Sequence, residues 1–485
     1  MRSQIRTRIH TLSRPQIGTA LVLALAASAL LPVTGMAQAA SAGIVGDRHG
    51  PPHSRSNAVV DWNATATQAA VTAGLSPDLD PLAESRLYAI TAVAVHDALN
   101  AVDRRYRPYL PGDRHVRRGA SPEAAVAAAA RDVLVPGLDA LRPELSDQQA
   151  VTNAIASVQA AYTTALAAIP DGPAERLGVE VGQDAAAAIQ DVRKTDHSSE
   201  VIVFDSNYPQ GTEPGQWRFT PDRPFAFAPK WGSVTPFVLR NNQQFAPSGP
   251  YPLTSPKYAA DLNEIKRLGG DARTGSQRTP EQTQIARFWV GSSPYQWNNI
   301  ARNLATDHHL DLWDSARLFG LLGMAMADGY TSSFATKFTV KFWRPVTAIR
   351  LADTDGNPAT SADPTWNPLV TTPPIPDYDS AHAVEGSAAA AVFTRFFGKD
   401  NVRFSVCSLT LPDPQNRCGG STPLLRHFSG FAQAAAENGE SRILVGFHFR
   451  KAVSDGLGRG IKIGNRAAHT PPGMRSGCHW RTCHR

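Results

Sequence analysis

The chain has 485 residues, 42% of them hydrophobic and 19% charged, enough for two packed units or one large helical domain. Its formal net charge of +6 includes a basic leader and a basic C-terminal tail, so the body between them is close to neutral. Because that body has no clustered lysine and arginine face, we expect no nucleic-acid partner.

Residues 1–39 have the pattern of a secretory signal peptide. Four arginines precede the apolar run IGTALVLALAASALL, and AQAA supplies a small-x-small cleavage site after Ala39. An uncleaved membrane anchor is the alternative, but the run is shorter than the ~20 apolar residues of a span and ends at Pro32. We therefore expect a secreted or periplasmic protein with no transmembrane segment after signal cleavage.

Helical patterns dominate the rest of the chain. Apolar residues recur at helical spacing, and Ser121-Pro122 provides an N-cap followed by proline at the first helical position. We predict an all-α protein built from helical bundles with long irregular connections. The predicted divisions after the signal peptide are an extended N-terminal arm (40–80), an N-terminal helical bundle (81–196), an irregular connection (197–255), a C-terminal helical bundle (256–470) and a basic tail (471–485).

The first of three notable stretches in the C-terminal bundle is KFTVKFWRP, which places Lys337 and Arg344 seven residues apart. If the stretch is helical, the two side chains share a face about 10.5 Å apart along the axis, and both can reach one anion. The alternative is a surface helix end with ordinary solvated charges.

The second stretch is PDYDSAHAVEGSAAAAVFTRFFG, in which Asp379 or Ser380 is a good N-cap and Gly398 follows the helix. Ser380, Ala381 and His382 then lie at a helix N-terminus, where backbone N–H groups and the helix dipole attract an anion. The alternative is a simple helix cap with a nearby histidine.

The third stretch, SRILVGFH, separates Arg442 from His448 by six positions. On a helix the two side chains would lie roughly 120° apart around the axis and would not share a face. Either both are incidental, or the chain changes course between them so that both side chains converge on something that other segments hold.

Together the three stretches supply two arginines, a lysine, a serine at a helix N-terminus and two histidines. This set suits a tetrahedral or trigonal oxyanion. Basic groups neutralise its oxygens, N–H groups orient it, and one histidine can bind or attack the central atom while the other moves protons. The sequence therefore predicts an oxyanion site in the C-terminal bundle.

The order K-x6-RP, DSAH, SR-x5-H resembles the signature shared by vanadium-dependent haloperoxidases and the type 2 phosphatidic acid phosphatase superfamily. The neighbouring sequence looks like the secreted bacterial branch of haloperoxidase-related proteins. The resemblance implies a haloperoxidase-like helical fold in which Lys337, Arg344 and Arg442 bind the oxygens of vanadate or phosphate. It also implies that the Ser380 hydroxyl and the Ala381 N–H assist.

The same resemblance gives the two histidines their roles. His448 would be the vanadium ligand of a haloperoxidase or the nucleophile of a phosphatase, and His382 would be the acid–base residue. Lys337 would also take part in catalysis. Two departures from the commonest motif bear on vanadate affinity: Ala381 replaces glycine and brings a methyl to the pocket, and Asp379 replaces proline and brings a carboxylate close to an anion site.

The preferred function is vanadate-dependent oxidation of halide by hydrogen peroxide. One alternative is a metal-free soluble acid phosphatase that cleaves phosphomonoesters through a phosphohistidine in the same pocket. Another is a secreted oxyanion-binding protein without turnover. The resemblance leaves a homodimer open.

Two further patterns have a metal-binding and a structural interpretation. Cys407 and Cys418 flank a loop that a disulfide can close, as do Cys478 and Cys483; zinc is the alternative, but no CxxC occurs. The stretch DHHLDLWD, residues 307–314, looks like a metal site, although its aspartates suit a helix start. We expect disulfides and a helix start.

Overall fold

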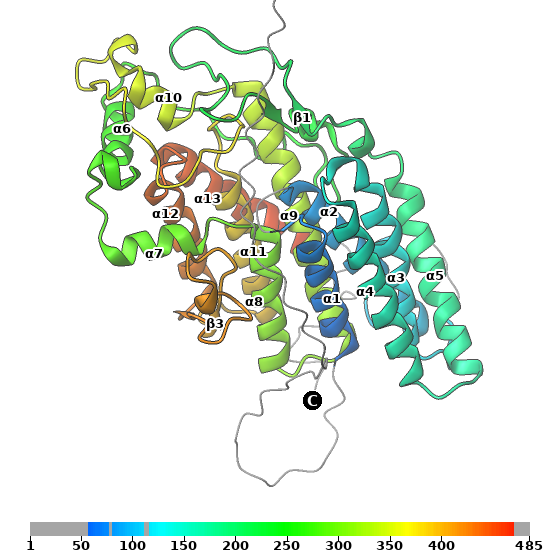
Figure 1. The fold of residues 1–485 in the computed structure, drawn as a ribbon. Helices are drawn as coiled ribbons and strands as arrows, with labels where there is room; N and C mark the ends of the chain where they lie inside the picture. Colours follow the sequence, from blue (N-terminus) through cyan, green and yellow to red (C-terminus); the bar gives the residue numbers. More distant parts are fainter. Residues whose placement is uncertain (1–56, 77–79, 111–115, 470–485) are drawn as a thin grey trace, which may run out of the picture. The chain divides into compact units, whose positions relative to one another are not determined.

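Side-chain caps set the helix starts in the N-terminal half of the chain. In the computed structural model, which describes residues 57–76, 80–110 and 116–469, the side chains of Asn57, Asp80 and Ser121 accept hydrogen bonds from the first turns of the helices that follow them. The helices of this half are α1 (Ala58–Thr72), α2 (Pro81–Val102), α3 (Pro122–Ala140), α4 (Gln148–Ala167) and α5 (Pro173–Arg193), and Figure 1 shows α2 to α5 side by side.

Helix α1 corrects the extended arm predicted for residues 40–80 over the part that the structure describes. Its buried residues include Trp62, Ala66, Ala69 and Ala70, and it packs against α3, α4 and α8 (Ser293–Asp307). Small alanines give a weak apolar pattern, and the stability of such a helix comes mainly from tertiary packing, which the local sequence does not reveal.

The C-terminal half contains the remaining helices, among which α9 is the longest. Several of these helices begin with proline at the first or second helical position. A serine, threonine or arginine precedes that proline. Besides α8, the helices are α6 (Pro256–Leu268), α7 (Pro280–Phe288), α9 (Leu312–Val340), α10 (Pro345–Arg350), α11 (Ala381–Phe397), α12 (Phe431–Leu444) and α13 (Arg450–Ala468).

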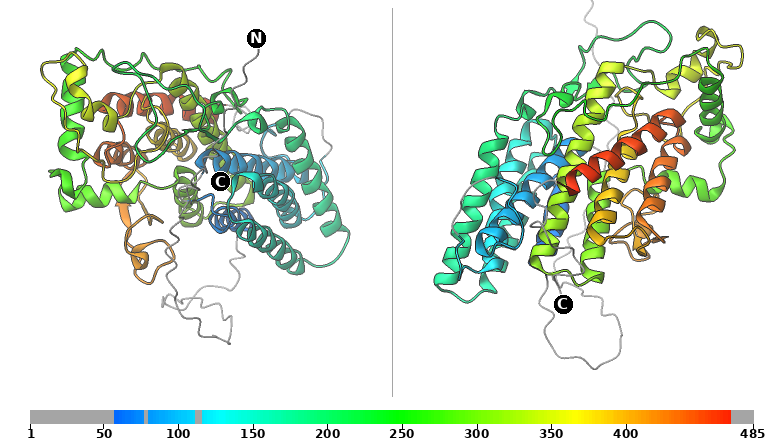
Figure 2. Two further views of the ribbon diagram at one scale, coloured as in Figure 1. Left: turned by 45° about the horizontal axis from the view of Figure 1, so that its top comes forward. Right: turned by 180° about the vertical axis from the view of Figure 1, so that it is seen from behind.

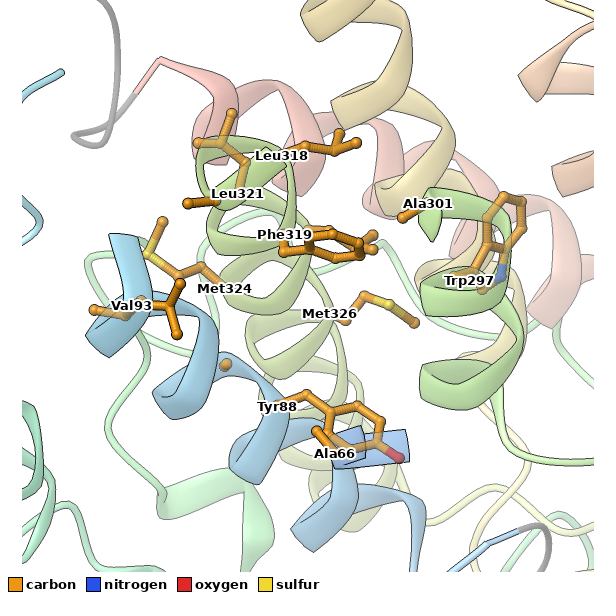
Figure 3. Packing of buried hydrophobic residues seen from close by; sticks show 14 of the residues in the cluster. Ala66, Tyr88, Val93, Trp297, Ala301, Leu318, Phe319, Leu321, Met324 and Met326 are labelled. Atoms are coloured by element: carbon orange, nitrogen blue, oxygen red, sulfur yellow. The ribbon is translucent and has the colours of Figure 1, made fainter. Parts of the chain in front are cut away.

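Helix α9 is buried on nearly all sides and joins the two halves. It contacts α1 and α2 from the N-terminal half and α8, α11 and α13 from the C-terminal half, as the two views of Figure 2 show. Its side chains Phe319 and Met326 point toward the helix that carries Trp297, α8, while Met324 points to the other side, toward Val93 of α2 (Figure 3). A helix that is buried on nearly all sides in this way is part of the core, and its buried polar side chains, such as Asp328 and Lys337, have hydrogen-bond partners there.

Between α5 and α6 the chain has no α-helix. It forms 3-10 turns and one short antiparallel pair, β1 (Phe204–Asp205) with β2 (Ala226–Phe227). The connection is nevertheless tied to α9, because the Asp328 carboxylate accepts hydrogen bonds from the backbone N–H groups of residues 237–239. These bonds fix an irregular segment against the helix that carries Lys337.

The predicted disulfide between Cys407 and Cys418 is confirmed. It lies in the loop between β3 (Phe404–Val406) and β4 (Arg426–Phe428), an antiparallel pair in which Phe404 is opposite Phe428. The all-α fold class is confirmed as well, since the strands are only two or three residues long.

Several predictions fall outside the described residues. These are the signal peptide of residues 1–39, residues 40–56 and 77–79 of the N-terminal arm, the basic tail and the pair Cys478 and Cys483. Within the ranges that are described, no helix has the length and apolar character needed to cross a membrane.

Candidate active site

Lys337 and Arg344 lie on different elements, which corrects the shared helix face considered for them. Helix α9 ends at Val340, and Lys341 follows in the left-handed conformation, with φ of 51°. Pro345 then opens α10, so that Arg344 occupies its N-cap position. The chain thus reverses between the two basic residues, and both side chains are fully buried.

Ser380 is the N-cap residue of α11, and its hydroxyl makes no cap hydrogen bond. The hydroxyl oxygen is buried and has no hydrogen-bond partner in the protein. Ala381 and His382 open the helix, so their N–H groups belong to the first turn, whose donors have no partner within a helix. The structure therefore presents the serine hydroxyl and a helix N-terminus at one place.

Arg442 and His448 converge because the chain turns between them. Arg442 lies in the last turn of α12, and His448 follows it just before α13 begins. Gly446 makes the turn with φ of 89°, and a Cβ there would lie 2.5 Å from the Gly269 carbonyl oxygen. Only glycine fits this close approach, so Gly446 is what brings the two side chains together.

His448 is held between a carboxylate and an arginine. Its Nδ1 lies 2.9 Å from Oδ1 of Asp377, and its Nε2 lies 3.0 Å from Nη1 of Arg344. The carboxylate is an acceptor only, so Nδ1 carries the proton and Nε2 keeps its lone pair. That lone pair is directed toward the basic residues, where it accepts from Arg344.

Arg344 and Lys337 are oriented by backbone carbonyls. Arg344 donates from Nε to the Ile375 carbonyl at 2.7 Å and from Nη1 to the Phe447 carbonyl at 2.9 Å. Lys337 donates from Nζ to the carbonyls of residues 376 and 377, both at 2.9 Å. An ammonium group has three donors, so one N–H of Lys337 remains for a ligand.

Arg442 and His382 are positioned by the connection between α7 and α8. Arg442 donates from Nη1 to the Trp289 carbonyl at 2.9 Å, and Nδ1 of His382 lies 3.3 Å from the Ser293 hydroxyl. Asn438 of α12 donates to the His382 carbonyl at 3.1 Å. One short segment thus contacts both the third basic residue and the second histidine.

The charges of the site do not balance. Three buried cations, from Lys337, Arg344 and Arg442, have Asp377 as the buried carboxylate that offsets their charge, because Asp379 is already paired with Arg459. Burial and the neighbouring Arg344 hold the pKa of Lys337 well below its usual value. Burial lowers the pKa of Arg344 to about 10, and burial together with Arg344 lowers that of Arg442 to about 9. A bound anion would relieve this repulsion.

Burial also governs the other titrating groups of the site. It lowers the pKa of both His382 and His448 well below the usual value, with Arg442 adding to the effect on His382 and Arg344 to that on His448. Burial raises the pKa of Asp377 to about 7, although Arg344 opposes the shift. Both imidazoles are therefore neutral at neutral pH.

Three hydrogen-bond donors of the site have no acceptor in the protein. They are Nη2 of Arg344, Nε of Arg442 and the hydroxyl of Ser380, all buried. Buried donors without partners are rare and costly, so their presence around an excess of positive charge indicates an anion with several oxygens. Vanadate and phosphate both fit this donor set.

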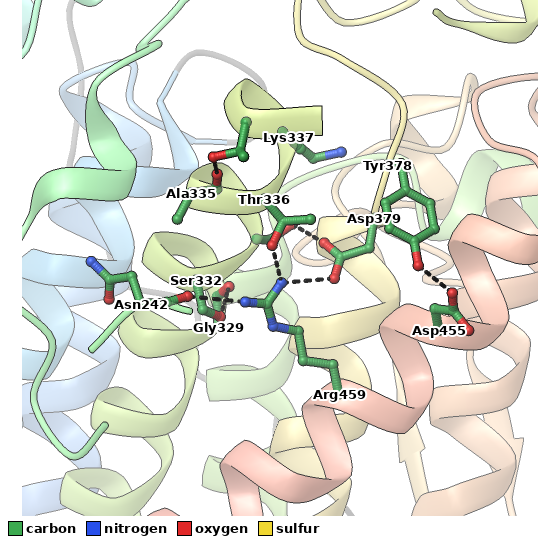
Figure 4. A network of polar contacts seen from close by, with 12 residues as sticks. Asn242, Gly329, Ser332, Ala335, Thr336, Lys337, Tyr378, Asp379, Asp455 and Arg459 are labelled. Atoms are coloured by element: carbon green, nitrogen blue, oxygen red, sulfur yellow. Dashed lines mark hydrogen bonds and ion pairs between the residues drawn. The ribbon is translucent and has the colours of Figure 1, made fainter. Parts of the chain in front are cut away.

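The two departures at positions 379 and 381 do not oppose an anion in the way expected from the sequence. Asp379 turns away from the site and pairs with the buried Arg459 of α13, at 2.9 Å (Figure 4). The methyl of Ala381 belongs to an apolar cluster that includes Phe334 and Ile375. Neither side chain therefore places charge or bulk against the three free donors.

Sequence reasoning missed three participants. Asp377, the hydrogen-bond partner of His448, lies two positions before Asp379 in the stretch PDYDSAH. An acidic residue this close to the predicted anion-binding residues was the signal that could have found it. Ser293 and Arg459 gave no signal, because their contacts join residues 89 and 80 positions apart in the chain.

The residues that resembled a metal site have structural roles, as expected. Asp311 is the N-cap of α9 and accepts from the Asp314 N–H, and His308 ends α8. Within the described ranges, no group of three or more His, Cys, Asp or Glu side chains is placed to hold a metal ion.

The comparisons relate the chain to the vanadium haloperoxidases, through its C-terminal helical bundle and through its fold. Residues 317–474 match the family model described as VCPO second helical-bundle domain. This part of the chain contains every predicted site residue from Lys337 to His448.

Vanadium chloroperoxidase from Curvularia inaequalis is 26% identical to the chain over 313 residues, 52% of this chain and 49% of that enzyme. The match thus spans about half the length of this relative. A crystal structure of a bacterial vanadium-dependent iodoperoxidase superimposes with a TM-score of 0.68 at 22% identity, covering 87% of this chain and 98% of that one. The apo form of a bacterial vanadium-dependent chloroperoxidase superimposes with a TM-score of 0.62 at 14% identity. That match covers 80% of this chain and 93% of the other. At these identities the structures share the fold.

Proposed function

We propose that the protein is an exported, vanadate-dependent haloperoxidase that oxidises a halide with hydrogen peroxide. The observation that carries the proposal is the convergence of three buried cations with three unpartnered donors and the Nε2 lone pair of His448. Such a set neutralises and orients an oxyanion while offering one nitrogen to its central atom. The relation of the chain to the vanadium haloperoxidases supports vanadate as that anion.

Each side chain has a defined task in this proposal. Bound vanadate supplies an electrophilic centre that activates hydrogen peroxide toward attack by halide. Arg344, Arg442 and Ser380 bind the vanadate oxygens through Nη2, Nε and Oγ. Nε2 of His448 would ligate the vanadium atom, and Arg344, which donates to this nitrogen at 3.0 Å in the structure, would then donate to the oxyanion instead. The third N–H of Lys337 would be free to donate to the bound anion.

His382 is the proton carrier in this proposal. Its imidazole is neutral in the free protein because burial and Arg442 lower its pKa, so it can accept a proton from hydrogen peroxide. Halide oxidation consumes a proton as water leaves, and His382 can return the one that it accepted. A small pocket is lined by Trp289, Ser293 and Thr410, and the first two of these residues also contact Arg442 and His382.

A phosphatase is the second candidate, and the contact between His448 and Asp377 favours it. A carboxylate on Nδ1 makes Nε2 a better nucleophile as well as a better ligand, which suits a phosphohistidine. The third candidate, an oxyanion-binding protein without turnover, is suggested by Asp379 and Ala381. Arg459 offsets the charge of Asp379, and the methyl of Ala381 belongs to an apolar cluster.

One experiment separates the three. The protein, purified without phosphate, is given bromide, hydrogen peroxide and a brominatable dye before and after orthovanadate is added. Bromination that requires vanadate and is lost when phosphate competes supports the haloperoxidase. Release of phosphate from a chromogenic phosphomonoester, inhibited by vanadate, supports the phosphatase, and vanadate binding with neither reaction supports the binding protein.

The variant His448→Ala tests the site itself. It removes the only side chain proposed to touch the central atom, so turnover should be abolished. The fold should persist, since His448 contributes one side-chain contact to Asp377 and one to Arg344. Unchanged turnover in this variant would refute the assignment.

A further inference from the structure

Asp379 and Arg459 form a fully buried ion pair directly behind the oxyanion site. Arg459 Nη1 donates to Oδ2 of Asp379 at 2.9 Å, and both side chains have 0% of their surface exposed. The second carboxylate oxygen of Asp379 accepts from the Ser333 hydroxyl at 2.7 Å. Both oxygens of this carboxylate are thus occupied by donors other than the three cations, although its charge still opposes the lowering of the Lys337 pKa.

The arginine completes a network that ties three segments together. From α13 it donates to the Thr336 hydroxyl on α9 at 2.7 Å and to the Asn242 carbonyl of the irregular connection at 3.0 Å (Figure 4). Thr336 precedes Lys337, and Asp379 precedes Ser380. The pair therefore adjoins two residues of the proposed site along the chain and links the elements that carry them.

Close packing brings α13 to this position. A Cβ on Gly456 would lie 2.8 Å from the Ser380 carbonyl oxygen, and Ser380 donates its backbone N–H to the Ala452 carbonyl at 3.1 Å. Helix α13 therefore fixes the backbone of Ser380 from one side while Arg459 fixes Asp379. The orientation of the Ser380 hydroxyl depends on both.

We propose that the Asp379–Arg459 pair is a positioning device for the oxyanion site, which sets anion affinity by keeping the Asp379 carboxylate turned away from Lys337. This inference rests on the proposed function, because it assumes that an oxyanion binds at Lys337, Arg344 and Arg442. Without Arg459, the Asp379 carboxylate would be a buried charge, and Lys337 would be the cation left to pair with it. The carboxylate would then compete with the bound anion for Lys337.

Anion affinity should depend on the Asp379–Arg459 pair and not on either residue alone. Arg459→Met leaves Asp379 charged and unpaired, so orthovanadate and phosphate should bind at least about tenfold more weakly. Asp379→Asn combined with Arg459→Met removes both charges, and the affinity should return to within about threefold of the unaltered protein. Arg459→Lys keeps the charge and should bind anion nearly normally.

The test is calorimetric titration of the full chain with orthovanadate and with inorganic phosphate, alongside thermal melting. Arg86→Met is the matched control, because it also breaks an Arg–Asp pair, with Asp196 at 2.8 Å, on a helix that carries no site residue. It should lower the melting temperature and leave anion affinity unchanged. A purely structural role for Arg459 would make the two variants alike.

The outcomes are distinguishable. Equal anion affinity in Arg459→Met and the unaltered protein would overturn the inference and leave the proposed function standing, as would a double variant that binds as weakly as Arg459→Met. If Arg459→Met fails to fold, the double variant and Arg459→Lys test the inference instead. Weak anion binding by both of these variants, with normal melting temperatures, overturns it. No anion binding by the unaltered protein would overturn the proposed function and this inference together.

Discussion

His448 and Asp377 are joined by a 2.9 Å hydrogen bond between Nδ1 and Oδ1, and both side chains are buried. The bond decides which nitrogen of the histidine faces the basic residues. Since the carboxylate takes the Nδ1 proton, Nε2 remains an acceptor and the ring is held in one orientation. Asp377 is therefore a positioning residue for His448.

Replacing Asp377 by Asn should lower activity without unfolding the protein. The amide keeps the shape of the side chain, but it removes the negative charge that makes the histidine a strong ligand. We expect a loss of about 10- to 100-fold in kcat/KM for bromide oxidation, the usual effect of removing such a partner. If the folded variant has the kcat/KM of the unaltered protein, the contact between Asp377 and His448 has no functional role.

The hydroxyl of Ser380 should matter for anion binding and hardly at all for folding. It has no hydrogen-bond partner in the protein, so Ser380→Ala removes no folding interaction. A hydrogen bond to a charged group contributes about 1.5–3 kcal/mol, so vanadate affinity should fall roughly 10- to 100-fold. Titration calorimetry measures this directly.

Ser387→Ala on the same helix is the control for Ser380→Ala. Its hydroxyl donates to the Ala383 carbonyl at 2.7 Å, within the helix and away from the site. Vanadate affinity should be unchanged there. A similar drop in both variants would mean that the effect comes from the helix and not from the Ser380 hydroxyl.

The sequence was sufficient for helices whose ends carry a chemical signal. Ser121 begins α3 and Gly398 ends α11 as predicted, because an N-cap side chain and a left-handed glycine act within one turn. The three segments of the site were also recognisable, since the spacing of their polar residues is local. Helix α1 was missed because alanines and polar residues alternate along it.

What the sequence could not supply is the contact between segments. The sequence leaves open whether Lys337 and Arg344 share one helix face, because nothing in the local pattern predicts the left-handed Lys341 that separates them. The partners Asp377 and Arg459 act on residues 71 and 80 positions away. Tertiary packing alone determines such pairs.

Anion binding should stabilise the protein, and Arg442 should be required for the effect. Burial, together with repulsion from Arg344, lowers the pKa of Arg442 to about 9, and a bound anion would offset both effects. Orthovanadate at 100 times its Kd should add about 2.7 kcal/mol to the free energy of unfolding and raise the melting temperature.

Arg442→Met should lose most of this stabilisation, because it removes one of the three charges and the unpartnered Nε. Arg395→Met is the control, since Arg395 is exposed, bonds to Asn465 and takes no part in the site. Thermal melting with and without orthovanadate measures both. An equal rise in melting temperature for Arg442→Met and the unaltered protein would place the anion elsewhere.

The last prediction concerns Glu84, which is buried in α2 and accepts hydrogen bonds from Ser76, Tyr88 and Ser292. Burial raises its pKa from 4.5 to about 7. The folded protein therefore holds this proton more tightly than the unfolded chain, so stability falls as the pH rises from about 4.5 to about 7 and then levels off. At 1.36 kcal/mol per pKa unit, the total is roughly 3 kcal/mol.

Glu84→Gln cannot ionise, so its free energy of unfolding should depend less on pH across that window than that of the unaltered protein. Chemical denaturation at pH 5 and pH 8 measures the difference, and comparing the two proteins isolates Glu84 from other buried acids such as Asp80 and Asp328, whose pKa values burial also raises to about 6. The exposed Glu180, replaced by Gln, should leave the profile unaltered. Parallel profiles for Glu84→Gln and the unaltered protein would show that Glu84 stays in one ionisation state throughout.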